Sequence, residues 1–239
     1  MKNLNDESQN GLLAESSILD AKLERRSFLQ YAGAGAALVA LTAAGCKKDK
    51  VVVNPGVTLD FKDDFGVLNY AYALEQLEAA FYIKVASAPP STFSTAEKNY
   101  FNDIQYHEIA HREFFKNALG AAAIGSLEVD FSSINFTDRT SVLGAAKAFE
   151  DLGVAAYNGA GYRLNDDKYI VIAGQIVSVE ARHAAYIRDL ISNGSFANLG
   201  ELTALGASDP NGLDGALTPD KVLAIAGTYI KTKVNVINL

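Results

Sequence analysis

The sequence reads Glu108-Ile109-Ala110-His111 in one segment and Glu180-Ala181-Arg182-His183 in another, so a Glu-x-x-His pattern occurs twice. Both copies lie in segments of helical periodicity, which we predict to run from about residue 95 to 119 and from about 166 to 192. Residues three positions apart share one face of a helix. Two of the chain's 3 histidines fall in this pattern, which chance explains poorly. The alternative to a functional motif is a pair of ordinary neighbours on solvated helix faces.

The same helices carry apolar residues at the spacing of a buried seam, and the motifs interrupt both seams. The seam positions are Phe101, Ile104, Glu108, His111, Phe115 and Ala118 in one helix and Tyr169, Ala173, Ile176, Glu180, His183, Ile187 and Leu190 in the other. Two further predicted helices, at about 64–86 and 138–160, place Glu75 and Glu150 in their own seams. Four carboxylates facing one core need either a compensating cation or a different rotation of the helices, because an unpaired buried carboxylate is energetically costly.

The two halves of the chain resemble each other around these glutamates. Glu75 is followed by Tyr82 at the same spacing as Glu150 is followed by Tyr157, and a Glu-x-x-His motif comes after each pair. Each tyrosine lies two turns beyond its glutamate on the same helix face. Tyr82 and Tyr157 are therefore candidate catalytic residues, as hydrogen-bond donors to a ligand carboxylate or as electron donors. Aromatic filling of the core is the alternative.

The alignment of the halves also discriminates between neighbouring glutamates. Glu78 corresponds to Gly153 and has no counterpart, which makes Glu75 the better ligand candidate. We expect Glu78 to be solvated or to lie beside the ligands. His107, outside the motif, is expected to be a plain helix residue rather than a ligand.

The connections between the predicted helices set the topology. About seven residues join the first pair and about five join the second, which forces each pair into an antiparallel hairpin. The link at 120–137 can cross the whole bundle, since an extended chain spans about 3.3 Å per residue. A shorter helix begins near Thr218-Pro219, and no segment shows the alternation of a strand. The predicted fold is all-α: a four-helix bundle of two antiparallel hairpins joined by a long crossover, plus a short C-terminal helix.

The composition excludes several classes of function. The chain has 239 residues, a formal net charge of −7 and 1 cysteine. The acidic balance leaves no basic surplus to neutralise phosphates, so nucleic acid is not an expected partner. One cysteine forms neither an internal disulfide nor a four-cysteine metal site.

The N-terminal segment has the features of a targeting signal. Arg25 and Arg26 precede an apolar run at 31–44 that is too short to span a membrane and ends near Cys46. The arginine pair resembles a twin-arginine export signal, and the sequence before Cys46 resembles a lipobox, with Ala43 where leucine is usual. An ordinary secretory signal is the alternative. The predicted segments are a signal peptide at 1–45, a tether at 46–62, the bundle at 63–193 and an extension with a short helix at 194–239.

Six side chains are candidate metal ligands: Glu75, Glu108, His111, Glu150, Glu180 and His183. Two Glu-x-x-His pairs and one glutamate from each remaining helix can surround two metal ions. Four carboxylates would balance the charge of two divalent cations. Oxygen-rich ligation with one imidazole per metal suits either two Fe ions or two Mn ions, and the lack of thiolates argues against structural zinc.

This pattern resembles the ferritin-like di-iron carboxylate superfamily. It is similar in particular to the exported ferritin-like domain family related to plant desiccation proteins, through residues 68–71, 74–82, 107–111 and 180–183. The resemblance implies that Glu75 and Glu150 are terminal ligands, that Glu108 and Glu180 bridge the metals, and that His111 and His183 each bind one metal. The sequence departs from the superfamily in lacking a rubredoxin-type cysteine centre, and its predicted anchor and long tail disfavour a sealed storage cage.

The resemblance implies two classes of function. An exported di-metal oxidoreductase would react Fe(II) with O₂ or peroxide and protect the bacterial envelope from iron-driven radical chemistry. A non-catalytic stress- or desiccation-related lipoprotein would use the metal pair for stability alone, and oxidation of a carbon substrate is a weaker third class. The expected partners are metal ions, O₂ or peroxide, the twin-arginine translocon and, through a lipid anchor, the periplasmic side of a membrane. A homodimer is a further possibility.

Overall fold

The computed structural model describes residues 56–239, so Arg25, Arg26 and Cys46 lie outside the described part of the chain. Four long helices dominate it: α2 (Asp64–Ser87), α3 (Thr95–Leu119), α4 (Arg139–Ala160) and α5 (Asp167–Ile191). A shorter helix, α6 (Pro219–Ala226), lies near the C-terminus. Short 3-10 turns occupy Gly120–Ala122, Gly161–Arg163, Ser195–Ala197, Leu199–Leu205, Asp209–Asn211 and Gly227–Tyr229. The predicted all-α bundle with a short C-terminal helix is confirmed.

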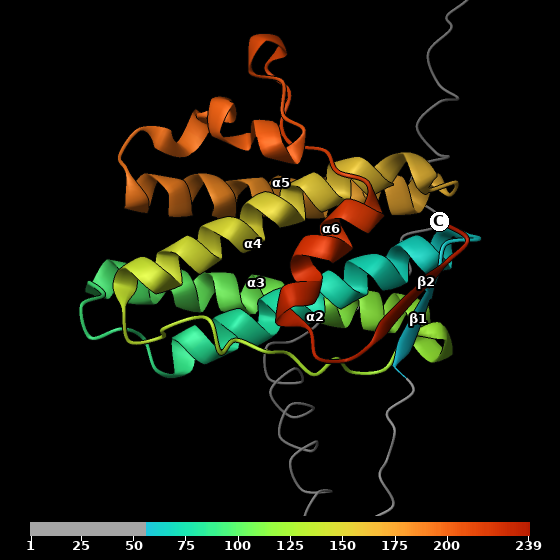
Figure 1. Cartoon of the computed structure of the whole chain (residues 1–239), viewed down its shortest axis with the longest axis horizontal. Helices are drawn as coiled ribbons and strands as arrows, with labels where there is room; N and C mark the ends of the chain where they lie inside the picture. The colour runs from blue at the N-terminus through green and yellow to red at the C-terminus, as the bar shows by residue number, and fades with distance from the viewer. Residues whose placement is uncertain (1–55) are drawn as a thin grey trace, which may run out of the picture. The chain divides into compact units, whose positions relative to one another are not determined.

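The helices begin and end where local chemistry predicts. The side chain of Ser94 accepts a hydrogen bond from the Glu97 backbone N–H at 3.2 Å, and the Glu97 carboxylate accepts one from the Ser94 N–H at 2.7 Å. This reciprocal pair satisfies two orphan donors at the start of α3. The same helix ends before Gly120, whose φ of 52° is favourable for glycine. Helix α2 packs on α3 and α4 packs on α5, which gives the two predicted hairpins (Figure 1).

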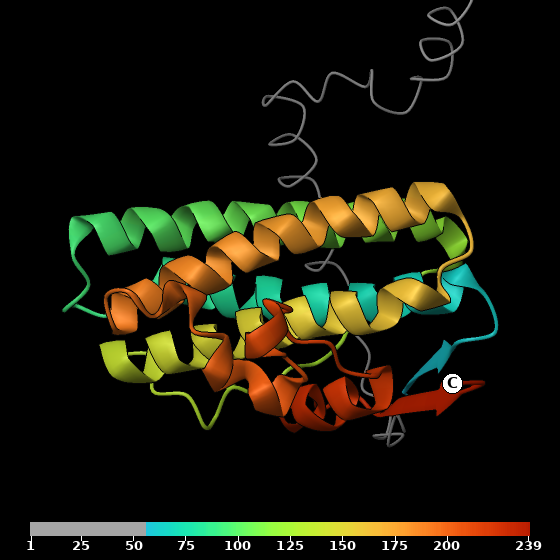
Figure 2. The same cartoon turned by 90° about the horizontal axis from the view of Figure 1, so that it is seen from above.

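The bundle has two layers of unequal exposure. Figure 2 shows α3 and α5 in one layer and α2 and α4 in the other, with the C-terminal segment along the outer side of α2 and α4. Helix α2 is accordingly buried on nearly all sides, whereas α3 and α5 keep polar faces in solvent. Among residues 56–239, no helix combines the length and apolar character needed to cross a membrane.

The crossover link packs along α2, and polar side chains of that helix satisfy its backbone. Asn69 donates to the Ala122 carbonyl at 3.0 Å and accepts from the Ile124 N–H at 2.8 Å. Gln76 accepts from the Leu127 N–H at 2.8 Å. These bonds explain why two amide side chains are buried in α2, because a link lying on the core needs partners for its own backbone groups.

Two short strands contradict the expectation that the chain has none. Strand β1 (Val57–Asp60) pairs in parallel with β2 (Val234–Ile237), in the register Val57 to Val234. Val57–Asp60 does alternate between apolar and polar residues, but 4 residues are the shortest run in which alternation indicates a strand, and Val234–Ile237 does not alternate throughout. Residues 57–60, which lie within the predicted tether at 46–62, form strand β1, and Leu59 is fully buried.

Candidate metal centre

The six candidate ligands of the sequence analysis meet in the middle of the bundle. Their ligand atoms form two groups, each within 4.8 Å: Glu75, Glu108, His111 and Glu180 in the first, and Glu108, Glu150, Glu180 and His183 in the second. Helices α2 and α4 contribute one glutamate each, and α3 and α5 contribute a Glu-x-x-His motif each. Glu108 and Glu180 belong to both groups, so they lie between the two positions that a metal pair would occupy.

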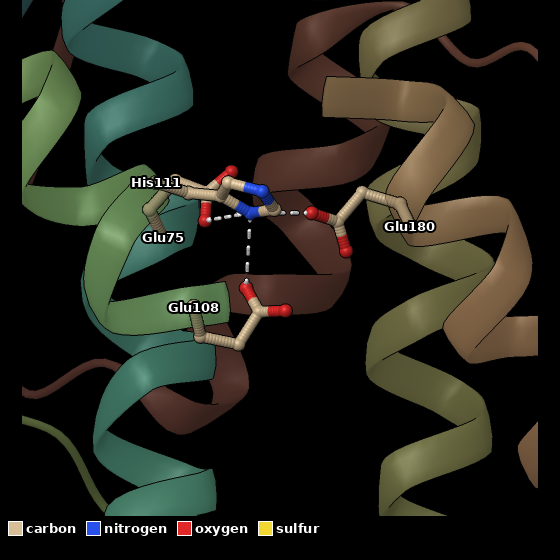
Figure 3. A group of neighbouring side chains, drawn as sticks. All are labelled: Glu75, Glu108, His111 and Glu180. Atoms are coloured by element: carbon tan, nitrogen blue, oxygen red, sulfur yellow. Dashed lines mark ion pairs between the residues drawn. The ribbon is translucent and has the colours of Figure 1, made fainter. Parts of the chain in front are cut away.

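Each histidine directs one ring nitrogen at three carboxylates. His111 Nδ1 lies 2.8 Å from Glu180, 3.5 Å from Glu75 and 3.7 Å from Glu108 (Figure 3). His183 Nδ1 lies 3.0 Å from Glu108, 3.4 Å from Glu150 and 3.6 Å from Glu180. Each half therefore combines a motif glutamate and its histidine, a terminal glutamate and the motif glutamate of the other half.

Hydrogen bonding does not account for these contacts. Each of the six residues has at least one buried oxygen or nitrogen without a hydrogen-bond partner, and the four glutamates are fully buried. A histidine Nδ1 carries at most one proton, so it cannot satisfy three carboxylates. Buried charged groups are normally paired or bind metals, and unpartnered atoms that converge on two points fit two cations. The oxygen-rich donor set suits Fe or Mn.

The pKa values of the cluster also indicate that its buried carboxylates lack a compensating charge. Burial raises the pKa of Glu75 to about 8 and raises that of Glu150 well above its ordinary value. Burial also acts to raise the pKa of Glu180, but the close approach of the His111 and His183 rings lowers it to about 2. Without a cation, the cluster keeps protons on the two terminal glutamates and on the histidines. Two divalent cations would replace those protons.

Tyr82 and Tyr157 connect the two halves of the site. The Tyr82 hydroxyl donates a hydrogen bond to Glu150 Oε1, and the Tyr157 hydroxyl donates one to Glu75 Oε1. Each tyrosine thus binds the terminal glutamate of the other half. The second oxygen of each glutamate faces a histidine, His183 for Glu150 and His111 for Glu75. The tyrosines therefore orient the terminal carboxylates and leave one oxygen of each directed inward.

Glu78 is not solvated, which corrects one of the two expectations for it. Its side chain is buried, and a Cβ atom built on Gly153 would lie 3.0 Å from Glu78 Oε1. The two residues that correspond in the sequence duplication therefore face each other, and the glycine leaves room for the carboxyl group. Burial raises the pKa of Glu78 well above its ordinary value.

A double-mutant cycle tests this contact. Gly153→Ala alone should lower the free energy of unfolding by about 1 kcal/mol, since overpacking outweighs the helix propensity of alanine. In a Glu78→Ala background the same change should raise it by about 1 kcal/mol, because the side chain whose atoms lie nearest to the new methyl group is gone. Urea unfolding measures both. Equal effects in the two backgrounds would show that Glu78 and Gly153 do not interact.

His107 is the residue that the sequence analysis missed. Its Nδ1 lies 2.9 Å from His183 Nε2, and the two rings are nearly parallel at 7°. A metal-ligating imidazole uses one nitrogen for the metal and donates a proton from the other. His107 can accept that proton at the surface end of the pair. Its position one turn before His111 was the signal available in the sequence.

His107→Phe should weaken metal binding in the half of the site that contains His183. Loss of the partner that orients a ligand typically costs about 10- to 100-fold in metal affinity. His107→Gln retains an acceptor and should recover part of the loss, whereas Tyr106→Phe, on the next residue, should have no effect. Metal titration of the four proteins measures the affinity. Equal affinities of the parent and His107→Phe would show that the imidazole pair does not support the site.

The fold and the site define a class: a four-helix bundle with a carboxylate and histidine core suited to a metal pair. Residues 63–193 match the family model of the ferritin-like domain, which covers more than half of the chain. The chain belongs to this ferritin-like family. No curated protein matches the chain in a sequence comparison.

Proposed function

We propose that this ferritin-like protein binds two iron ions in the six-residue cluster and oxidises Fe(II) with O₂ or peroxide, with manganese as the alternative metal. The observation that carries the proposal is the convergence of buried, unpartnered ligand atoms on two positions. Two Fe(II) ions would supply the two electrons that, with two protons, reduce O₂ to H₂O₂ or H₂O₂ to two water molecules.

Two of the six side chains would bind both metal ions, and the other four would bind one ion each. Glu108 and Glu180, which belong to both groups, would bridge the ions. Glu75 and His111 would complete one coordination sphere, and Glu150 and His183 the other. The tyrosine hydroxyls hold a proton against the outer oxygens of Glu75 and Glu150, which keeps these carboxylates in place. The fully buried glutamates keep water from most of the site.

Oxidation kinetics test the proposal. Purified protein should oxidise Fe(II) added in large excess over two ions per chain, with many turnovers in the presence of O₂ or peroxide. Glu108→Ala removes an oxygen donor from both groups and should abolish turnover. Oxidation that stops after two Fe(II) ions per chain would favour the stress-related alternative, in which the metal pair stabilises the bundle without catalysis.

We also propose that the protein is exported to the periplasmic side of a bacterial membrane and anchored there by lipidated Cys46. The Arg25-Arg26 pair and the sequence before Cys46 support this proposal. Export through the twin-arginine translocon would allow metal to be loaded in the cytoplasm. In the envelope, Fe(II) oxidation would limit radical damage under oxidative or desiccation stress.

Substitution of Cys46 tests the anchor. Cys46→Ser should move the protein from the membrane fraction to the soluble periplasmic fraction, because the substitution removes the residue that would carry the lipid anchor. Arg25→Lys with Arg26→Lys should instead leave the precursor in the cytoplasm. Cell fractionation and immunoblotting measure both. A membrane-bound Cys46→Ser protein or normal export of the double variant would contradict the respective assignment.

A further inference from the structure

An apolar cavity lies inside one end of the bundle, next to the metal centre. All four long helices contribute to its wall, which has almost no polar surface. Its wall includes Leu74, Phe115, Tyr157, Ala160, Tyr169 and Ala173. Gly161 and Leu164, in the connection between α4 and α5, also line it, and the cavity is partly open.

The cavity lies beside one half of the site, and none of the six candidate ligands is part of its wall. The ring of Tyr157 forms part of the wall, while its hydroxyl hydrogen-bonds to Glu75. Leu74 precedes Glu75 in α2, and Phe115 lies one turn beyond His111 in α3. The cavity therefore adjoins the half of the site that contains Glu75 and His111.

The size and polarity of the cavity restrict its occupant. Its volume of about 20 Å³ admits about one small molecule, because about 10–15 Å³ is enough to hold a single water-sized sphere. A water or peroxide molecule needs polar partners, and polar atoms contribute almost none of the surface of this wall. Small apolar cavities in proteins stay dry and take up apolar gases. A diatomic apolar molecule meets both conditions.

We infer that this cavity binds dioxygen and delivers it to the Glu75 and His111 half of the site. The inference rests on the proposed function, which allows O₂ or peroxide as the oxidant. Of these two, the cavity admits O₂. Peroxide must reach the site by another path, because the same wall disfavours a polar molecule. Filling the cavity should consequently slow the reaction with O₂ and spare the reaction with peroxide.

Two measurements on the full-length, metal-loaded protein test the cavity. Crystals pressurised with krypton, an apolar gas with a strong anomalous signal, should show a bound atom between Tyr157 and Ala173. Ala173→Leu should remove it, whereas Ala118→Leu adds the same volume at an exposed position of α3 and should leave it in place. Absence of krypton from the parent cavity would overturn the inference whether or not the protein turns over.

Rapid mixing of the Fe(II)-loaded protein with each oxidant tests delivery. Ala173→Leu should react with O₂ about tenfold more slowly, which is about 1.4 kcal/mol in the activation barrier, and with peroxide at the parent rate. Equal rates with O₂ in the parent and Ala173→Leu would overturn the inference and leave the proposed function intact. If the protein without substitutions oxidises no Fe(II) with either oxidant, the proposed function is overturned, and so is the delivery of O₂ through the cavity.

Discussion

Removal of both metal ions is expected to lower the melting temperature of the protein by about 10 °C or more. An uncompensated buried charge costs about 3–5 kcal/mol, and each kcal/mol shifts the melting temperature of a domain of this size by about 2–4 °C. Glu75, Glu108, Glu150 and Glu180 are all fully buried and would face one another without a cation. Calorimetry before and after treatment with a chelator measures the shift. An unchanged melting temperature would contradict metal binding at these residues.

The chelated protein should lose further stability as the pH rises from about 4.5 to 8. Burial raises the pKa of Glu75 to about 8, so across this range the folded chain retains a proton that the unfolded chain has released. Burial acts to lower the pKa of His183, but Glu150 and the other carboxylates raise it to about 12, which extends the loss of stability to higher pH. Urea unfolding at several pH values measures the trend.

The metal-loaded protein is the control for this pH dependence. Its ligands stay ionised while they hold cations, so its free energy of unfolding should change less over the same range. A free energy of unfolding that rises with pH in the chelated protein would contradict the assignment of raised pKa values to the buried carboxyl groups.

Glu75→Gln is expected to reduce the metal content from two ions per chain to one. The change removes one charge and one donor from the group that contains His111, and it leaves the Glu150 and His183 group intact. Glu78→Gln is the matched control, since it makes the same substitution one turn further along α2. Glu78 belongs to neither group, and its raised pKa favours a neutral acid that glutamine imitates closely.

Metal analysis of the purified variants measures the difference. We expect two ions in the parent and in Glu78→Gln, and fewer in Glu75→Gln. Two ions in Glu75→Gln, or fewer in Glu78→Gln than in Glu75→Gln, would reverse the choice of ligand. That result would also undercut the sequence duplication on which the choice depends.

Much of the site follows from the periodicity of the sequence. The positions of Glu75, Glu108, Glu150 and Glu180 in apolar seams predict that they face the core, and the structure buries all four. Short connections predict two hairpins and a long crossover, and both are present. These features are local, since a helix of 3.6 residues per turn fixes which side chains share a face.

Other features depend on contacts between helices and were not predictable in this way. The sequence places Tyr82 on the face of Glu75, but the hydroxyl binds Glu150 on a different helix. Glu78 is buried because Gly153 faces it across the bundle. His107 meets His183 through the approach of α3 to α5.

The same division explains the two strands. Val57 and Val234 pair from opposite ends of the described chain, and runs of 4 residues give only a weak strand signal in the sequence. The sequence by itself determined which residues turn inward and how the hairpins connect, because helical periodicity and loop length act locally. The tertiary structure alone decided which inward residues meet, because that depends on the packing and rotation of every helix against its neighbours.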